Sequence, residues 1–127
     1  MEERSDLVAL FRALGDPTRV RIFDYLCAVA EEETRDCPGG SVLHRGATVG
    51  DVCSHVLGVK TSSAMSFHLK EMKMAGLIHS NRSGRQILCT VAPEAVEVLR
   101  DYLAHLPDVE EDSLEVMAEK ESEPALV

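Results

Sequence analysis

Small hydroxyl side chains and basic side chains are concentrated between residues 61 and 85. Short hydroxyls near the start of a helix can reach phosphates or base edges, and arginine fits both a phosphate and a narrow minor groove. An aromatic ring on the same helix can press on a thymine methyl group. These residue types predict contact with double-stranded DNA through Thr61, Ser62, Ser63, Ser66, Phe67, Lys70, Arg82 and Arg85.

The same side chains also have plainer explanations. A serine at the start of a helix can cap it instead of touching a ligand, and Phe67 can cover the neighbouring core. Lys70 and the arginines can simply be solvated. We expect His68 to be a hydrogen-bonded structural residue rather than a reader of bases.

The elements that would carry these side chains are a helix and a hairpin. One of Thr61, Ser62 and Ser63 caps the helix, and Gly76 ends it as a C-terminal glycine. Its inner face is predicted to hold Ala64, Met65, His68, Leu69 and Met72. Two strands at 77–78 and 86–91 follow, joined by residues 81–85. A helix followed by a hairpin tipped with arginines is typical of a winged helix-turn-helix.

Four further helices are predicted around this unit. Apolar residues at helical spacing mark residues 6–14, and Asp16 and Pro17 begin a second helix that fades around Ala30. Residues 31–46 form a loop, after which Thr48 caps a third helix that stops at Gly58. The last helix runs from Pro93 to Pro107. The predicted fold is mainly α, with five helices and a small β-hairpin.

The distribution of charge removes an objection to DNA binding. The chain of 127 residues has a formal net charge of -9, which opposes contact with phosphates. Residues 60–85, however, contain five basic residues and one acid, whereas residues 107–127 contain eight acids and one lysine. We therefore expect a domain over residues 1–106, including the inserted loop 31–46, and an acidic, disordered tail over residues 107–127.

The chain has no apolar run long enough for a membrane span, and its amino terminus is acidic where a signal peptide would be basic and then apolar. We expect a cytoplasmic protein. In that compartment Cys27, Cys37, Cys53 and Cys89 would be free thiols, ligands or redox switches rather than structural disulfides.

Three strings resemble the ArsR/SmtB family of small dimeric regulators. They are residues 13–23 (ALGDPTRVRIF), residues 66–77 (SFHLKEMKMAGL) and residues 84–86 (GRQ). The resemblance covers residues 6–106 and implies a repressor that binds operator DNA as a homodimer through its first and last helices and is released by an inducer. Two segments are longer than in the family: the turn at 58–66 by one residue, and the link at 31–46, which contains Cys37 and His44.

The metal sites that the resemblance implies are incomplete. The family places a Cys-x-Cys pair where this chain reads ATVGD at 47–51, and His105 alone stands near the end of the last helix. Cys27, Cys37 and Cys53 could instead converge if the loop folds back. Three thiolates would suit a thiophilic metal or metalloid ion such as trivalent arsenic, and two would suit a disulfide or persulfide switch. The alternative is that Cys27, Cys53 and Cys89 are small apolar core residues.

Two other classes of protein compete with the repressor. A winged helix can serve as a protein-interaction adaptor that senses no inducer. A thiol oxidoreductase is the third class, but the chain lacks a Cys-x-x-Cys pair, and no spacing of Ser, His, Asp or Cys suggests a catalytic nucleophile. We therefore expect a DNA-binding protein and not an enzyme.

Overall fold

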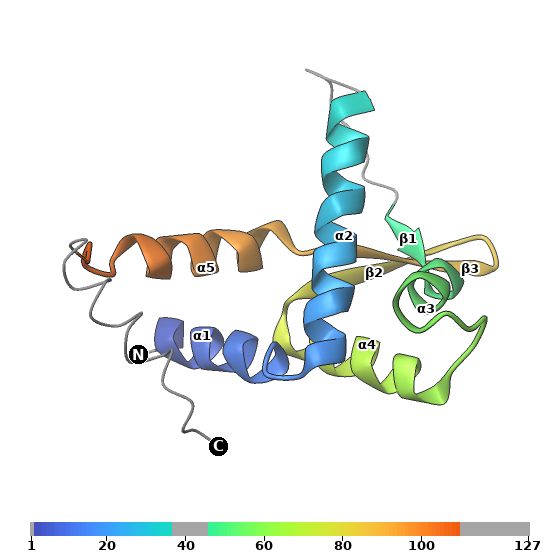
Figure 1. Ribbon diagram of the computed structural model, residues 1–127, viewed down its shortest axis with the longest axis horizontal. Helices are drawn as coiled ribbons and strands as arrows, with labels where there is room; N and C mark the ends of the chain where they lie inside the picture. Colours follow the sequence, from blue (N-terminus) through green and yellow to red (C-terminus); the bar gives the residue numbers. More distant parts are fainter. Residues whose placement is uncertain (1, 37–45, 110–127) are drawn as a thin grey trace, which may run out of the picture.

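The computed structural model describes residues 2–36 and 46–109. Its elements follow the order α1 (Glu2–Ala13), α2 (Pro17–Asp36), β1 (Ala47–Thr48), α3 (Val49–Leu57), α4 (Ser63–Ala75), β2 (Ile78–Ser83), β3 (Gln86–Val91) and α5 (Pro93–Ala104). Figure 1 shows α2 at the centre, with α1 and α5 on one side and α3, most of α4 and the sheet on the other. The predicted fold class is confirmed. None of the described helices is long and apolar enough to span a membrane.

The start of α2 follows from two adjacent residues. The Asp16 carboxylate accepts hydrogen bonds from the backbone N–H groups of Thr18, at 2.8 Å, and Arg19, at 3.2 Å. Pro17 occupies the first helical position, where a residue without an N–H loses nothing. The predicted capping role of Asp16 is confirmed.

The predicted end of α2 at Ala30 is wrong, because the helix continues to Asp36. Residues 31–36, which the sequence assigned to a loop, are EEETRD, and glutamate and arginine are good helix formers. The Thr34 hydroxyl also donates to the Ala30 carbonyl at 2.9 Å, so this threonine is accommodated within the helix. Of the expected loop, residues 37–45 lie outside the described residues, as does the expected acidic tail from residue 110 onward.

The sheet has the antiparallel order β1-β3-β2. Strand β2 runs to Ser83 instead of stopping at Ile78, so the hairpin is longer and its turn tighter than predicted. Strand β1, which was not predicted, pairs Ala47 with Cys89 and Thr48 with Leu88. Two residues carry no periodicity of their own, so this strand exists only through its long-range pairing.

One apolar core joins α2 to every element that carries the predicted DNA contacts. Buried side chains come from α2, α3, α4, the hairpin and the start of α5: Ile22, Leu26, Val52, Cys53, Val56, Met65, Leu69, Met72, Leu77, Ile78, Cys89, Ala92 and Ala95. Close packing of these side chains fixes the positions of α4 and β3 relative to α2.

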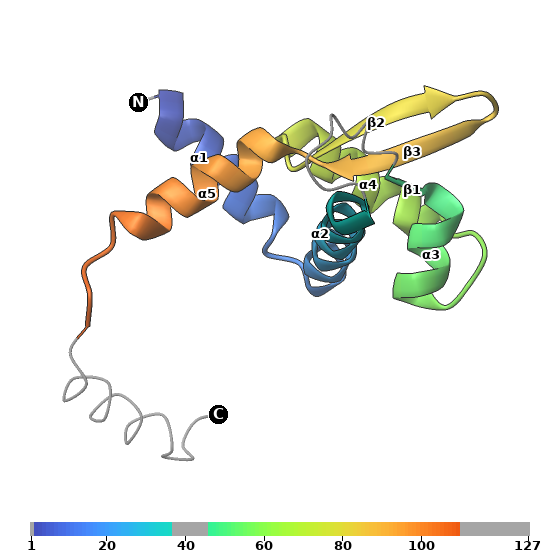
Figure 2. The same cartoon turned by 90° about the horizontal axis from the view of Figure 1, so that it is seen from above.

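Helix α5 lies above α1 in the view of Figure 1, and the two helices cross in the view of Figure 2. The rings of Phe11 and Tyr102 pack edge to face, with centroids 5.6 Å apart and planes at 72°. Five large apolar side chains of α1 and of the α5 region remain exposed: Val8, Phe11, Val98, Leu103 and Leu106. We call these five residues the α1/α5 apolar face.

Candidate nucleic-acid interface

The N-cap of helix α4 is Ser62, whose hydroxyl accepts a hydrogen bond from the Met65 N–H at 3.3 Å. It ends at Gly76, which has a φ of 88° and so adopts the left-handed conformation that glycine tolerates best. Both predicted ends are confirmed. The Ser62 hydroxyl therefore serves the helix itself, whereas Thr61 and Ser63 are exposed beside it.

The exposed face of α4 carries four of the predicted contact residues. Ser63, Ser66, Phe67 and Lys70 are exposed and follow the i, i+3, i+4, i+7 spacing of one helix stripe. Phe67 is 55% exposed, which is unusual for a phenylalanine. We call these four residues the α4 reading face. They present hydroxyl, aromatic and cationic groups together.

The opposite stripe of α4 anchors the helix. Met65, Leu69 and Met72 are buried there, as predicted. The prediction that Ala64 also faces inward is wrong, because it is exposed. Ala64 precedes Met65 in the first turn and therefore points about 100° away from it around the helix axis.

Helix α3 precedes α4 and has defined caps at both ends. Thr48 and Asp51 form a capping box at its start, in which the Asp51 N–H donates to the Thr48 hydroxyl at 3.0 Å. Its C-cap, Gly58, has a φ of 74° and turns the chain toward α4. Residues 58–62 then connect α3 to α4, so the two helices and their link form a helix-turn-helix.

The hairpin supplies the second set of predicted contacts. Figure 2 shows β2 and β3 extending beyond the helices to a tip at Gly84 and Arg85. Gly84 has a φ of 63° and no other residue of the turn has a positive φ, which suits the first central position of a two-residue hairpin turn. Arg82 and Arg85 are both exposed near this tip. The structure thus places the reading face and the arginines on separate, adjoining elements.

His68 makes the kind of contact that we predicted, with a partner that sequence reasoning missed. Its Nδ1 accepts a hydrogen bond of 3.0 Å from Nε of Arg19 in α2. The two residues are 49 positions apart, so no local pattern links them. The only hint in the sequence is the position of Arg19 within the family-like string at residues 13–23.

The cysteines of the predicted thiol site have different environments. Cys53 is 1% exposed within the core, whereas Cys27 is half-buried on α2. Burial and the negative charges of Asp24 and Glu31 raise the pKa of the Cys27 thiol, against a smaller effect of Arg100. Burial also raises the pKa of Cys89. Cys37 lies outside the described residues.

We expect Cys27 to react slowly with iodoacetamide. Because its pKa is raised, the reactive thiolate is a smaller fraction of this thiol at pH 8 than in an unfolded chain. Site-resolved mass spectrometry of native protein, with the urea-unfolded protein as control, should show slower alkylation in the native state. Faster alkylation of native Cys27 would contradict this assignment and indicate an activated thiol.

The described residues contain no group of three His, Cys, Asp or Glu side chains that could hold a metal ion. Where the ArsR/SmtB family that the sequence resembles has its Cys-x-Cys pair, this chain has the capping box of Thr48 and Asp51. His105 contacts Asp101, and His79 contacts Glu94. The donors of the family's usual metal sites are therefore not assembled within residues 2–36 and 46–109.

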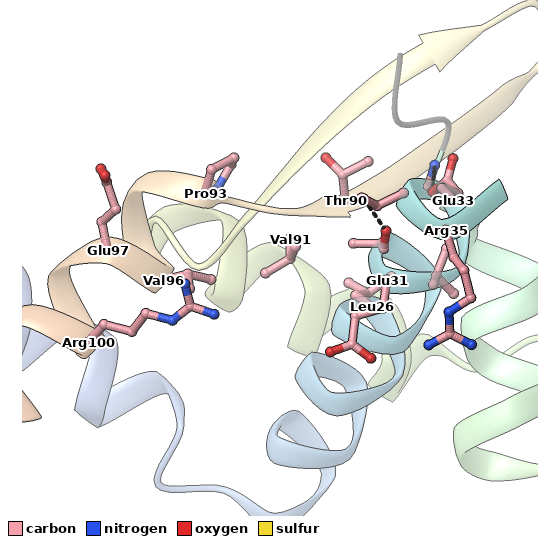
Figure 3. Close-up of a pocket in the computed structure, with 14 residues that line it drawn as sticks. Leu26, Glu31, Glu33, Arg35, Thr90, Val91, Pro93, Val96, Glu97 and Arg100 are labelled. Atoms are coloured by element: carbon pink, nitrogen blue, oxygen red, sulfur yellow. Dashed lines mark hydrogen bonds between the residues drawn. The ribbon is translucent and has the colours of Figure 1, made fainter. Parts of the chain in front are cut away.

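A half-open cleft of about 630 Å³ lies between the second half of α2, the end of β3 and the start of α5 (Figure 3). Leu26, Val91 and Val96 form part of its apolar surface, and Arg35 and Arg100 approach from α2 and α5. No described cysteine and none of the predicted DNA contacts line it. The cleft is thus separate from both the reading face and the thiols.

Solved structures of transcriptional regulators share this architecture. An ArsR-family transcriptional regulator matches with a TM-score of 0.57 and 21% identity, covering 94% of this chain and 95% of that chain. A possible transcriptional regulator for arsenical resistance matches with a TM-score of 0.57 and 25% identity, covering 85% and 93%. The transcriptional repressor BigR from Xylella fastidiosa matches with a TM-score of 0.51 and 17% identity, covering 84% and 93%. A scan against protein-family models and a search of the curated proteins give no match.

Proposed function

Because this chain has the winged helix-turn-helix fold of the ArsR-family transcriptional regulators, we propose that it is a dimeric, sequence-specific repressor released from its operator by an inducer. The observation that carries this proposal is the α4 reading face beside a hairpin tip with two exposed arginines. The reading face enters the major groove, where its hydroxyls and Phe67 meet base edges. Arg82 and Arg85 contact the flanking phosphates or the minor groove.

A homodimer supplies the length of DNA contact that one copy lacks. A single helix of this size reads a few base pairs, whereas a two-fold dimer reads two half-sites one or more helical turns apart. The α1/α5 apolar face supports this arrangement, since exposed apolar patches on small proteins mark interaction sites. A self-complementary contact of this face with its copy gives a two-fold dimer that carries two α4 helices.

The inducer acts through thiols in this proposal, and its class is a thiophilic metal or metalloid ion, or a redox or sulfur species. Cys27 and Cys37 are the candidate ligands or switch residues, with Cys53 as the third. Cys53 must leave the core to take part, because it is 1% exposed. A gel shift repeated with arsenite, zinc, cadmium, sulfide and peroxide tests this part of the proposal. Unchanged operator affinity with every one of them would contradict sensing while leaving DNA binding intact.

An Arg85→Ala substitution is expected to reduce the salt dependence of operator binding. Each phosphate contact that is lost lowers the slope of log affinity against log salt by about one unit, and it weakens all DNA sequences alike. Fluorescence anisotropy at several salt concentrations measures the slope. Arg35→Ala is the matched control, because Arg35 is also exposed but stands near the end of α2, far along the chain from the β2–β3 hairpin, which is the wing of the fold. Equal slopes for wild type and Arg85→Ala would remove Arg85 from the interface.

A further inference from the structure

The Arg19 side chain contacts the end of α1 and two successive residues of α4. Its Nε donates to Nδ1 of His68 at 3.0 Å, and its Nη1 donates to the Ala13 carbonyl at 3.5 Å. Its Cζ also lies 6.0 Å from the centroid of the Phe67 ring, which is within the range of a cation–π contact. One side chain therefore joins the α1–α2 junction to α4.

The backbone of Arg19 is held at the same place. Its N–H donates to the Asp16 carboxylate at 3.2 Å, as part of the cap that begins α2. An arginine in the first turn of a capped helix has little freedom to move its backbone. The Arg19 side chain therefore extends from a backbone position that is fixed.

The direction of the hydrogen bond also identifies the accepting ring nitrogen of His68. A guanidinium has only donors, so Nδ1 of His68 must offer a lone pair. In the tautomer that makes this contact, the ring proton is on Nε2.

We infer that Arg19 is a positioning residue for DNA recognition, which sets the rotation of α4 by fixing His68 and Phe67. Phe67 belongs to the reading face, and His68 is half-buried on the flank of α4, about 100° further around the helix. We call the contacts of Arg19 with His68 and Phe67 the Arg19 clamp. The clamp resists rotation of α4 about its own axis, and that rotation decides which side chains face the base edges. This inference rests on the proposed function, and it adds a residue outside the predicted interface.

Operator affinity in a double-mutant cycle tests this role. Arg19→Met removes the donor and the charge while keeping an unbranched apolar chain, and His68→Leu removes the acceptor. Each single variant is expected to bind operator about tenfold more weakly, and the double variant no more weakly than either single one. Additive losses in the double variant, or wild-type affinity in both single variants, would overturn the inference.

Two further variants separate positioning from a general loss of charge or stability. His68→Asn keeps an acceptor close to the position of Nδ1 and is expected to restore affinity to within about threefold of wild type, the lower end of such couplings. Arg21→Met removes an exposed arginine two residues further along α2 and is expected to leave the preference for operator over scrambled DNA unchanged. Loss of this preference in Arg21→Met as large as in Arg19→Met would show that charge alone matters. Melting temperatures that fall in Arg19→Met and His68→Leu without any change in affinity would show that the contact serves only the fold.

A measurement without DNA keeps this inference distinct from the proposed function. Nitrogen-15 NMR of the histidine rings should show His68 as a single tautomer protonated at Nε2, and as a tautomer mixture in Arg19→Met. Suppose that this result is found but the wild type shows no preference for any DNA. The contacts of Arg19 with α4 are then confirmed, while their role in recognition is overturned together with the proposed function. A tautomer mixture in the wild type would overturn the clamp itself, whatever the protein binds.

Discussion

A Phe11→Glu substitution is expected to convert the proposed dimer into monomers and to weaken operator binding by about 100-fold or more, because each half-site is then bound alone. Phe11 is 44% exposed, belongs to the α1/α5 apolar face, and packs its ring on Tyr102. Burying an unpaired carboxylate against a second copy costs several kcal/mol, on the order of the whole contribution of such a contact. Sedimentation equilibrium gives the oligomeric state, and anisotropy gives the operator affinity.

Val20→Glu is the control for this substitution. Val20 is exposed to a similar degree, but it lies on α2 and outside the α1/α5 apolar face. It should leave the dimer intact. A Phe11→Glu protein that remains dimeric would show that the two copies meet elsewhere.

A Gly46→Ala substitution is expected to destabilise the protein by about 3 kcal/mol, from a left-handed backbone together with a steric clash. Gly46 has a φ of 82°, and an added Cβ would lie 2.2 Å from the Cys89 carbonyl oxygen and 2.5 Å from Cγ2 of Thr90. The methyl group cannot be accommodated unless β1 separates from β3, which also carries one side of the wing. Urea unfolding followed by circular dichroism measures the loss.

Gly58→Ala is the matched control for the clash. Gly58 has a φ of 74°, yet a Cβ there would meet nothing within 4 Å. Only the cost of placing alanine in a left-handed backbone applies at Gly58, so a loss of about 1 kcal/mol of stability is expected. Equal losses at the two positions would contradict the close approach of Gly46 to β3.

The capped ends of α3 and α4 were predictable because their signals are local. The caps lie within a few residues of the backbone groups that they satisfy: Thr48, Gly58, Ser62 and Gly76. Such signals survive in the sequence whatever the rest of the fold does. The prediction for the end of α2 failed because acidic composition was taken as a sign of a loop, although EEETRD has good helix propensity.

Features that depend on distant residues were not predictable. Strand β1 is two residues long and exists only by pairing with Leu88 and Cys89. Arg19 reaches His68 across 49 positions of sequence, so neither residue could suggest the other. For the candidate interface, the sequence alone predicted the types of the contact residues and their place on one helix. The contact from α2 that orients this helix was visible only in the structure.

The thiol chemistry is where sequence and structure agree least closely. Sequence spacing allowed Cys27, Cys37 and Cys53 to converge, but Cys53 is packed in the core and the pKa of Cys27 is raised. Both observations favour apolar packing over reactivity for these two residues. A sensing role for this set therefore requires a rearrangement around α3 that brings Cys53 to the surface.

The central claim is that the α4 reading face and the wing bind operator DNA. It is tested most directly by titrating the wild-type protein, at several salt concentrations, into labelled DNA from upstream of its own gene and into a scrambled duplex of equal length. We predict tighter binding to the upstream DNA and a steep fall in affinity for both duplexes as the salt concentration rises. Equal affinity for the two duplexes, or no binding even at low salt, would contradict it and favour a winged-helix adaptor that binds another protein.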